Sequence, residues 1–202
     1  MAKDLFNSIA HIYGWFHRYQ MKRFAQILDS HGDKIPLAHM QTVCDVGCGT
    51  GALCAVLGAK GLTVTGIDAA QRMLEVAKKK VRHPNVTFVQ GEAGKGLSFP
   101  DSSFDVVFTS YVAHGIAKEK RKAFYTELKR IATKAVIIQD YDEERSLATT
   151  IIEWLEHGDY FRFIQHPQKE MEEVFPVIIP ITVGKQACWY VCHCPSKELT
   201  IR

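Results

Sequence analysis

Three glycines at alternate positions, Gly47, Gly49 and Gly51, follow a short apolar stretch and precede a stretch of helical spacing. Glycine permits a tight turn and lets a ligand approach backbone amides without meeting a Cβ atom. A glycine loop between a strand and a helix is typical of nucleotide sites, although a structural turn also uses glycine. Dinucleotide enzymes carry G-x-G-x-x-G, whereas the third glycine here comes one residue earlier. The spacing therefore favours a different nucleotide-like ligand.

An acidic residue, Asp68, ends the next apolar stretch of the chain. In a doubly wound sheet this carboxylate lies beside the loop of the first strand and accepts hydrogen bonds from both hydroxyls of a ribose. The alternative is a helix cap for the segment that begins at Ala70. Asp68 is thus a candidate ligand-binding residue.

Short β-branched runs alternate with longer stretches of helical spacing, which predicts parallel βαβ units. The expected strands are Thr42 to Gly47, Thr63 to Asp68, Val86 to Glu92, Phe104 to Tyr111, Ala135 to Tyr141, Val177 to Gly184 and Ala187 to Cys194. The expected helices between them are Ala52 to Ala59, Ala70 to Arg82 and Ala117 to Ala132. Apolar residues at helical spacing before and after Gly14 predict amphipathic helices ahead of the sheet.

The last two strands are separated by three residues, too few for a parallel crossover, so they should form an antiparallel hairpin. The predicted fold class is α/β: a doubly wound, Rossmann-like sheet of seven mostly parallel strands with an antiparallel last strand. The 202 residues, 47% of them hydrophobic and 23% charged, fit one globular domain over 1–202.

The net charge of +3 is spread along the chain, so no nucleic-acid partner is expected. Lys3 and Asp4 stand where a signal peptide would begin its apolar region. No apolar run approaches the ~20 residues of a membrane span. These two observations predict a cytoplasmic protein. Six cysteines suggest reduced thiols. Strand alternation sends Cys192 and Cys194 to one face and His193 to the other, so no metal site is expected.

Several motifs together carry a family resemblance. They are the D-x-G-C-G-x-G loop at 45–51, the acid at Asp68, the segment from Leu97 to Val107 followed by Tyr111-Val112-Ala113-His114, and the N-terminal segment from Phe6 to Tyr13. Over roughly residues 5 to 141 the chain resembles the class I S-adenosylmethionine-dependent methyltransferases. The likeness is to the small-molecule branch that includes ubiquinone and menaquinone methyltransferases.

The resemblance implies S-adenosylmethionine as cofactor and S-adenosylhomocysteine as product. It implies that the amides of Gly47 and Gly49 face the methionine part, that Asp45 holds its ammonium group, and that Asp68 binds the ribose. Further cofactor contacts are implied for Cys48, Gly51, Ala69, Met73, Glu92, Ala93, Ser110 and Tyr111. Residues 1–35 would form a helical cap over the cofactor.

The acceptor is expected to be a small molecule, held between the N-terminal helices and an insertion at 142–173 that shapes the pocket. If it is a phenol, enol or alcohol, a base must remove its proton, and His114 is the candidate. The alternative makes His114 a polar helix-start residue. Tyr13 and Tyr141 could border the acceptor, although aromatic residues at such spacing are more often core.

Three other functions stay open. An rRNA or protein methyltransferase would use the same cofactor, and a non-catalytic module would bind it without turnover. A nicotinamide-dependent oxidoreductase is weakened by the glycine spacing.

Overall fold

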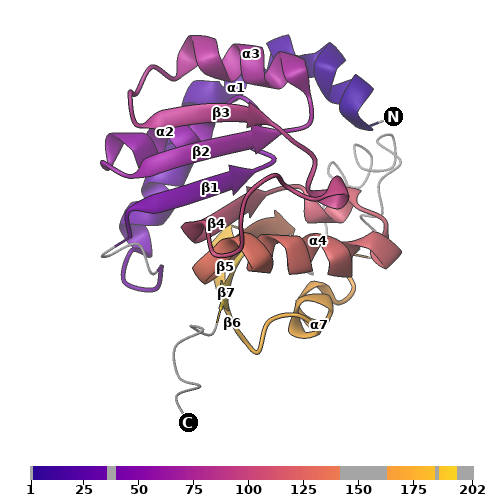
Figure 1. Cartoon of the computed structure of the whole chain (residues 1–202). Coiled ribbons are helices and arrows are strands. Elements are labelled where there is room, and N and C mark those ends of the chain that lie inside the picture. Colours follow the sequence, from indigo (N-terminus) through magenta and orange to yellow (C-terminus); the bar gives the residue numbers. More distant parts are fainter. Residues whose placement is uncertain (1, 36–39, 142–162, 185–186, 195–202) are drawn as a thin grey trace. The chain divides into compact units, whose positions relative to one another are not determined.

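The computed structural model describes residues 2–35, 40–141, 163–184 and 187–194, with side chains from residue 15 onward. The chain divides into two compact units, Met1–Ser98 and Phe99–Arg202. Figure 1 labels the elements along the chain. None of the helices in the described residues is long and apolar enough to span a membrane.

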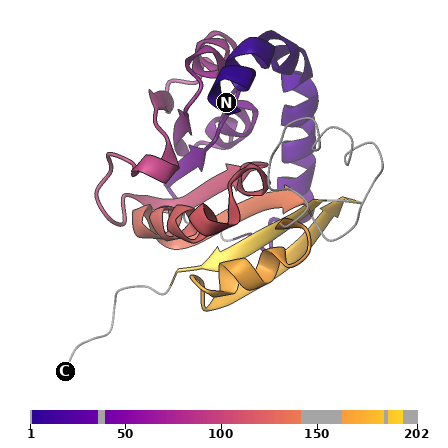
Figure 2. The same cartoon turned by 90° about the vertical axis from the view of Figure 1, so that its right-hand side faces the viewer.

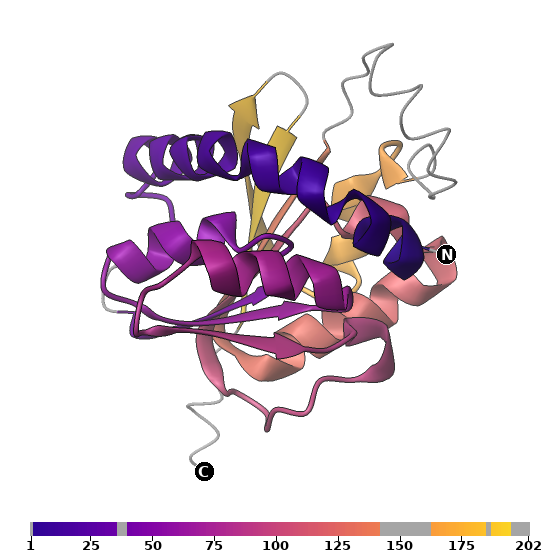
Figure 3. The ribbon, with the colours of Figure 1, turned by 90° about the horizontal axis from the view of Figure 1, so that it is seen from above.

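The first unit contains parallel strands in the order β3-β2-β1. Two helices, α2 and α3, lie on one face of these strands, and α1 packs against both helices (Figure 3). The elements are α1 (Ala2–Ser30), β1 (Thr42–Val46), α2 (Ala52–Ala59), β2 (Thr63–Asp68), α3 (Gln71–Lys80), β3 (Val86–Gln90) and the 3-10 helix η1 (Ala93–Lys95).

The helix α1 runs without interruption from Ala2 to Ser30, through Gly14. The apolar spacing on both sides of this glycine predicted helical structure ahead of the sheet, and the structure forms it as one continuous helix. One glycine inside a helix costs only about 1 kcal/mol relative to alanine, which the flanking turns and the packing on α2 and α3 offset.

The second unit contains strands in the order β4-β5-β7-β6. β4 and β5 are parallel, and β7 is antiparallel to both of its neighbours. Figure 2 shows α4 alongside β4 and β5, with α7 near β6. The elements are β4 (Phe104–Ser110), the 3-10 helix η2 (Ala113–Gly115), α4 (Lys118–Ile131), β5 (Ala132–Tyr141), α7 (Pro167–Glu172), β6 (Val177–Gly184) and β7 (Ala187–His193).

Apolar stripes explain the cores of these units. Phe124, Leu128 and Ile131 of α4 are buried, as their spacing predicts, and so is the continuous run 135–138 of β5. Only residues 185–186 lie between β6 and β7, which pair antiparallel as the hairpin prediction requires. The predicted fold class, a seven-stranded and mostly parallel α/β sheet, is confirmed.

Candidate functional site

The glycine loop begins where β1 ends, and its three glycines all have left-handed backbone angles. Gly51, with φ of 76°, stands at the N-cap of α2, and a Cβ atom there would lie 2.8 Å from the ring of Phe88. Gly49, with φ of 52°, differs, since a Cβ atom there would meet nothing within 4 Å. Gly51 thus serves packing, while Gly49 borders open space that a ligand can approach.

Asp68 lies at the carboxyl end of β2 and binds the tip of this loop. Its Oδ2 accepts a hydrogen bond from the amide of Gly49 at 2.8 Å, and its Oδ1 accepts one from the amide of Ala70 at 2.8 Å. The amide of Ala70 precedes the first turn of α3, which has no side-chain cap bond, so the helix-cap alternative is not supported. Each carboxylate oxygen keeps a second lone pair for a hydroxyl group.

The amides of Gly47 and Gly49, which the resemblance implied face the methionine part, donate hydrogen bonds within the unit. Gly47 donates to the carbonyl of Ile67 at 2.8 Å, and Gly49 donates to Asp68. Both amides therefore already have acceptors within the unit, and a position facing the methionine part of a cofactor stays a prediction.

Asp45 is a buried carboxyl in β1. Its Oδ2 accepts a hydrogen bond from the thiol of Cys54 at 3.3 Å, whereas its Oδ1 has no hydrogen-bond partner within the described part of the chain. Burial, with a smaller contribution from the charge of Asp68, raises the pKa of Asp45 to about 7. A cationic group beside Oδ1 would favour the ionised form.

The other cofactor residues predicted in this unit are spread over three elements. Met73 is buried on α3, and the carbonyl of Ala69 accepts a hydrogen bond from the side chain of Gln90. Glu92 is paired with Lys95, with Oε2 2.8 Å from Nζ, and Ala93 begins η1. Cys48 is buried within the loop. Contact of these residues with a cofactor stays a prediction.

The second unit brings His114 of η2 against Asp140 of β5. Nδ1 of His114 lies 2.7 Å from Oδ1 of Asp140, and both side chains are buried. The carboxylate of Asp140 also accepts hydrogen bonds from the amides of Ala113, His114 and Tyr141. Because an ionised carboxylate only accepts, Nδ1 of His114 is the donor, which leaves Nε2 with a lone pair that can take a proton.

Two tyrosines surround the imidazole. The ring centroid of His114 is 4.9 Å from that of Tyr141 and 6.5 Å from that of Tyr111, in edge-to-face arrangements. Tyr111 is 41% exposed and has a left-handed backbone with φ of 55°, which is rare for a side chain of this size. Such strain is concentrated at functional sites. We name His114, Tyr111, Tyr141 and Asp140 the histidine cluster.

The sequence interpretation missed Asp140. The signal was an acid at the end of an apolar strand, the same signal that identified Asp68. It also missed Gln139 and Trp189, which pair with Ser110 in one row across β4, β5 and β7. Ser110 Oγ, Gln139 Oε1 and Trp189 Nε1 are buried without hydrogen-bond partners among the described residues. Buried polar atoms of this kind need a ligand or an internal water.

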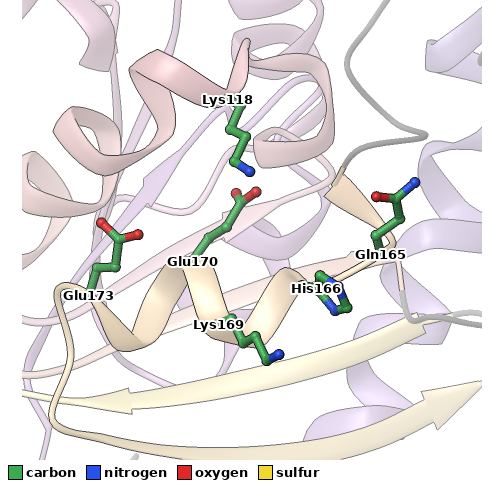
Figure 4. A pocket seen from close by; sticks show the side chains of 6 residues that line it. All are labelled: Lys118, Gln165, His166, Lys169, Glu170 and Glu173. Carbon is green, nitrogen blue, oxygen red and sulfur yellow. The ribbon is translucent and has the colours of Figure 1, made fainter.

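A pocket of about 440 Å³ lies elsewhere in the second unit, between α4 and α7. Figure 4 shows its lining, in which Lys118 of α4 points toward Glu170 of α7. The lining residues are Lys118, Gln165, His166, Lys169, Glu170 and Glu173. None of the predicted site residues is among them. The described end of the predicted insertion thus lines a different pocket, and its residues 142–162 lie outside the described part.

Of the predicted acceptor residues, Tyr141 belongs to the histidine cluster. Tyr13 belongs to α1, but its side chain lies outside what the structure describes. Within the described ranges, no three His, Cys, Asp or Glu side chains gather as metal ligands would. The structure therefore brings the predicted residues together in two groups, one in each unit.

Comparison with known proteins identifies a domain within the chain. Residues 43–135 match the family described as methyltransferase domain. A malonyl-[acyl-carrier protein] O-methyltransferase from Halalkalibacterium halodurans is 32% identical over 121 residues, which are 56% of this chain and 44% of that protein. A demethylmenaquinone methyltransferase from Lactococcus lactis is 33% identical over 119 residues, which are 54% of this chain and 46% of that protein. The chain thus spans less than half the length of these relatives.

The fold has a counterpart in the solved structure of magnesium protoporphyrin IX methyltransferase from Synechocystis. The TM-score is 0.59 at 18% identity, with 88% of this chain and 83% of that chain covered. At this identity the likeness concerns the fold alone. The domain match and the named relatives agree with the motifs of the loop and the second strand. Residues 43–135 therefore match a methyltransferase domain, and the resemblance to the class I S-adenosylmethionine-dependent methyltransferases is confirmed.

Proposed function

We propose that the chain binds S-adenosylmethionine through its first unit and methylates a hydroxyl group of a small molecule, with His114 as the general base. The observation that carries the proposal is the position of Asp68, whose carboxylate holds the amide of Gly49 and keeps free lone pairs. An acid so held beside a glycine loop suits the two hydroxyls of a ribose.

The residues around the loop fit this cofactor. Oδ1 of Asp45 is a buried acceptor with no partner in the described part of the chain, which suits an ammonium group. The open space beside Gly49 leaves room for a ligand at the loop tip. When bound, S-adenosylmethionine supplies an electrophilic methyl group on a sulfonium sulfur.

The histidine cluster supports a hydroxyl acceptor. Methyl transfer to a neutral hydroxyl needs a base, and the Asp140 carboxylate fixes the tautomer of His114 whose Nε2 can accept the proton. Asp140 also stabilises the imidazolium that forms. The rings of Tyr111 and Tyr141 offer an apolar border for a planar acceptor. The relative named ubiquinone biosynthesis O-methyltransferase is compatible with a hydroxyl acceptor.

Calorimetric titration of the whole chain tests the cofactor. We expect S-adenosylmethionine and S-adenosylhomocysteine to bind in the micromolar range, Asp68→Ala to weaken both, and NADH not to bind. Absence of binding, or binding of NADH instead, would overturn the proposal.

A transfer assay with methyl-tritiated S-adenosylmethionine tests the acceptor. The acceptor panel contains catechol, demethylmenaquinol, an aliphatic alcohol and a primary amine, with total RNA and a protein lysate as further arms. We expect label in the phenolic acceptors. Label in RNA or protein instead would favour a macromolecular substrate, and binding without transfer to any arm would favour a non-catalytic module.

A further inference from the structure

His17 of α1 contacts the glycine loop directly. Its Nδ1 lies 3.1 Å from Oγ1 of Thr50, and both side chains are only 3% exposed. Water therefore competes little for this hydrogen bond. Burial and the nearby charge of Lys80 lower the pKa of His17, so its ring is neutral at pH 7.

Thr50 stands at the tip of the loop, between Gly49 and Gly51. Glycine loses more conformational entropy on folding than other residues. Because left-handed glycines stand on both sides of Thr50, ordering this tip has a high entropic cost. Contacts from outside the loop must hold it. The amide of Gly49 is held by Asp68, and the hydroxyl of Thr50 is held by His17.

We infer that His17 is a positioning residue for the cofactor, because its bond to Thr50 holds the loop in the shape that delivers Gly49 to Asp68. This inference rests on the proposed binding of S-adenosylmethionine. Without the bond, the tip samples other conformations, and the fraction of molecules competent to bind falls. The apparent dissociation constant rises in inverse proportion to that fraction.

The bond also ties α1 to the loop. It joins residues 33 positions apart in the sequence, and α1 packs along α2 and α3 as well. A change in loop shape is thereby transmitted to α1 at His17. Occupancy of the loop should consequently reduce the motion of the α1 backbone around this position.

Matched substitutions test the inference with S-adenosylhomocysteine as the probe. Thr50→Val removes the hydroxyl with little change of shape, and His17→Leu removes the ring nitrogen. We expect each to raise the dissociation constant about fivefold, the loss expected for one buried neutral hydrogen bond. The double variant should be no worse than either single variant, because both remove the same bond.

Two conservative variants and one control complete the design. Thr50→Ser keeps the hydroxyl and His17→Asn keeps a polar atom near the place of Nδ1, so both should bind nearly as tightly as the wild type. Lys22→Ala changes an exposed residue of the same helix and should have no effect.

Hydrogen exchange of the unliganded protein provides a readout without ligand. We expect peptides covering 44–54 to exchange faster in Thr50→Val and His17→Leu, with equal protection of α4 in the second unit. Unchanged loop exchange together with unchanged affinity in a folded Thr50→Val would overturn the inference. If the wild type binds no S-adenosylhomocysteine, the proposed function fails, while loop exchange still decides whether His17 orders the loop.

Discussion

The imidazole of His114 and the carboxylate of Asp140 meet at 2.7 Å, although 26 positions separate them in the sequence. They meet because β4 and β5 are adjacent parallel strands whose carboxyl ends lie at the same edge. Three backbone amides donate hydrogen bonds to the same carboxylate and hold it in the orientation that meets the ring. This arrangement fixes both the tautomer and the orientation of a candidate base.

Replacing His114 by alanine should slow methyl transfer to a phenol by roughly 10²- to 10⁴-fold, the usual contribution of a general base. Asp140→Asn should also slow the transfer, because the amide group can donate to Nδ1 and so hold the ring in the tautomer whose Nε2 already carries a proton. Turnover measured with catechol or the best phenol of the panel checks this, while calorimetry should give an unchanged affinity for S-adenosylhomocysteine. The exposed His166→Ala is the control. Full turnover in His114→Ala would return this residue to a structural role.

Asp68→Asn should raise the dissociation constant of S-adenosylhomocysteine by roughly 10- to 100-fold, the range expected for losing charge-assisted hydrogen bonds. The substitution also weakens the bond that Gly49 donates to the carboxylate. Asp29→Asn, at an exposed carboxylate paired with Lys60, is the matched control and should bind normally. An unchanged affinity in Asp68→Asn would refute the ribose assignment.

Asp45 should make the unliganded protein less stable as the pH rises. Its carboxyl titrates at about 7 when folded against 3.8 in its ordinary state, so between these pH values the folded state binds the extra proton. Stability therefore falls as the pH increases through this window. Asp45→Asn should remove the slope and gain up to about 4 kcal/mol at pH 8, with no gain at pH 4. Urea unfolding from pH 4 to pH 8 measures this, and parallel curves for both proteins would contradict it.

Glu170→Gln should destabilise the second unit by about 3 kcal/mol, because it removes the negative charge that pairs with the buried guanidinium of Arg121. Nη2 of Arg121 donates to Glu170 at 3.0 Å, Nη1 donates to the carbonyl of Ile116, and the ring of Phe163 lies beneath the guanidinium. Glu173→Gln breaks the exposed pair with Lys122 and should cost less than 1 kcal/mol. Thermal unfolding compares the two variants, and equal losses would show that burial of Arg121 does not matter.

The sequence predicts regular elements well where one face of a strand or helix is apolar. The ranges of β2, β6 and α2 agree with the predictions residue for residue, because β-branched runs and turn residues define their ends. β5 begins three residues earlier than expected, since Thr133 and Lys134 are polar residues that the ladder tolerates. The helical spacing continues across Gly14, and one helix forms there because packing overrides a single poor helix former.

The candidate site was predictable where a motif places residues close together along the chain. The loop and Asp68 follow from one βαβ unit, and the pairing of β1 with β2 brings them together. The partners of His17 and His114 could not be predicted in this way. Thr50 and Asp140 meet these rings through tertiary packing, which no local spacing encodes. For the same reason the sequence could not show that the amides of Gly47 and Gly49 are already used.

The division of the chain into Met1–Ser98 and Phe99–Arg202 separates the two groups of predicted residues. The loop, Asp45, Asp68 and the His17 bond all belong to the first unit, whereas the histidine cluster belongs to the second. If the proposed function holds, the residues of the histidine cluster can therefore be substituted one by one to change the acceptor without replacing any residue of the loop, Asp45 or Asp68.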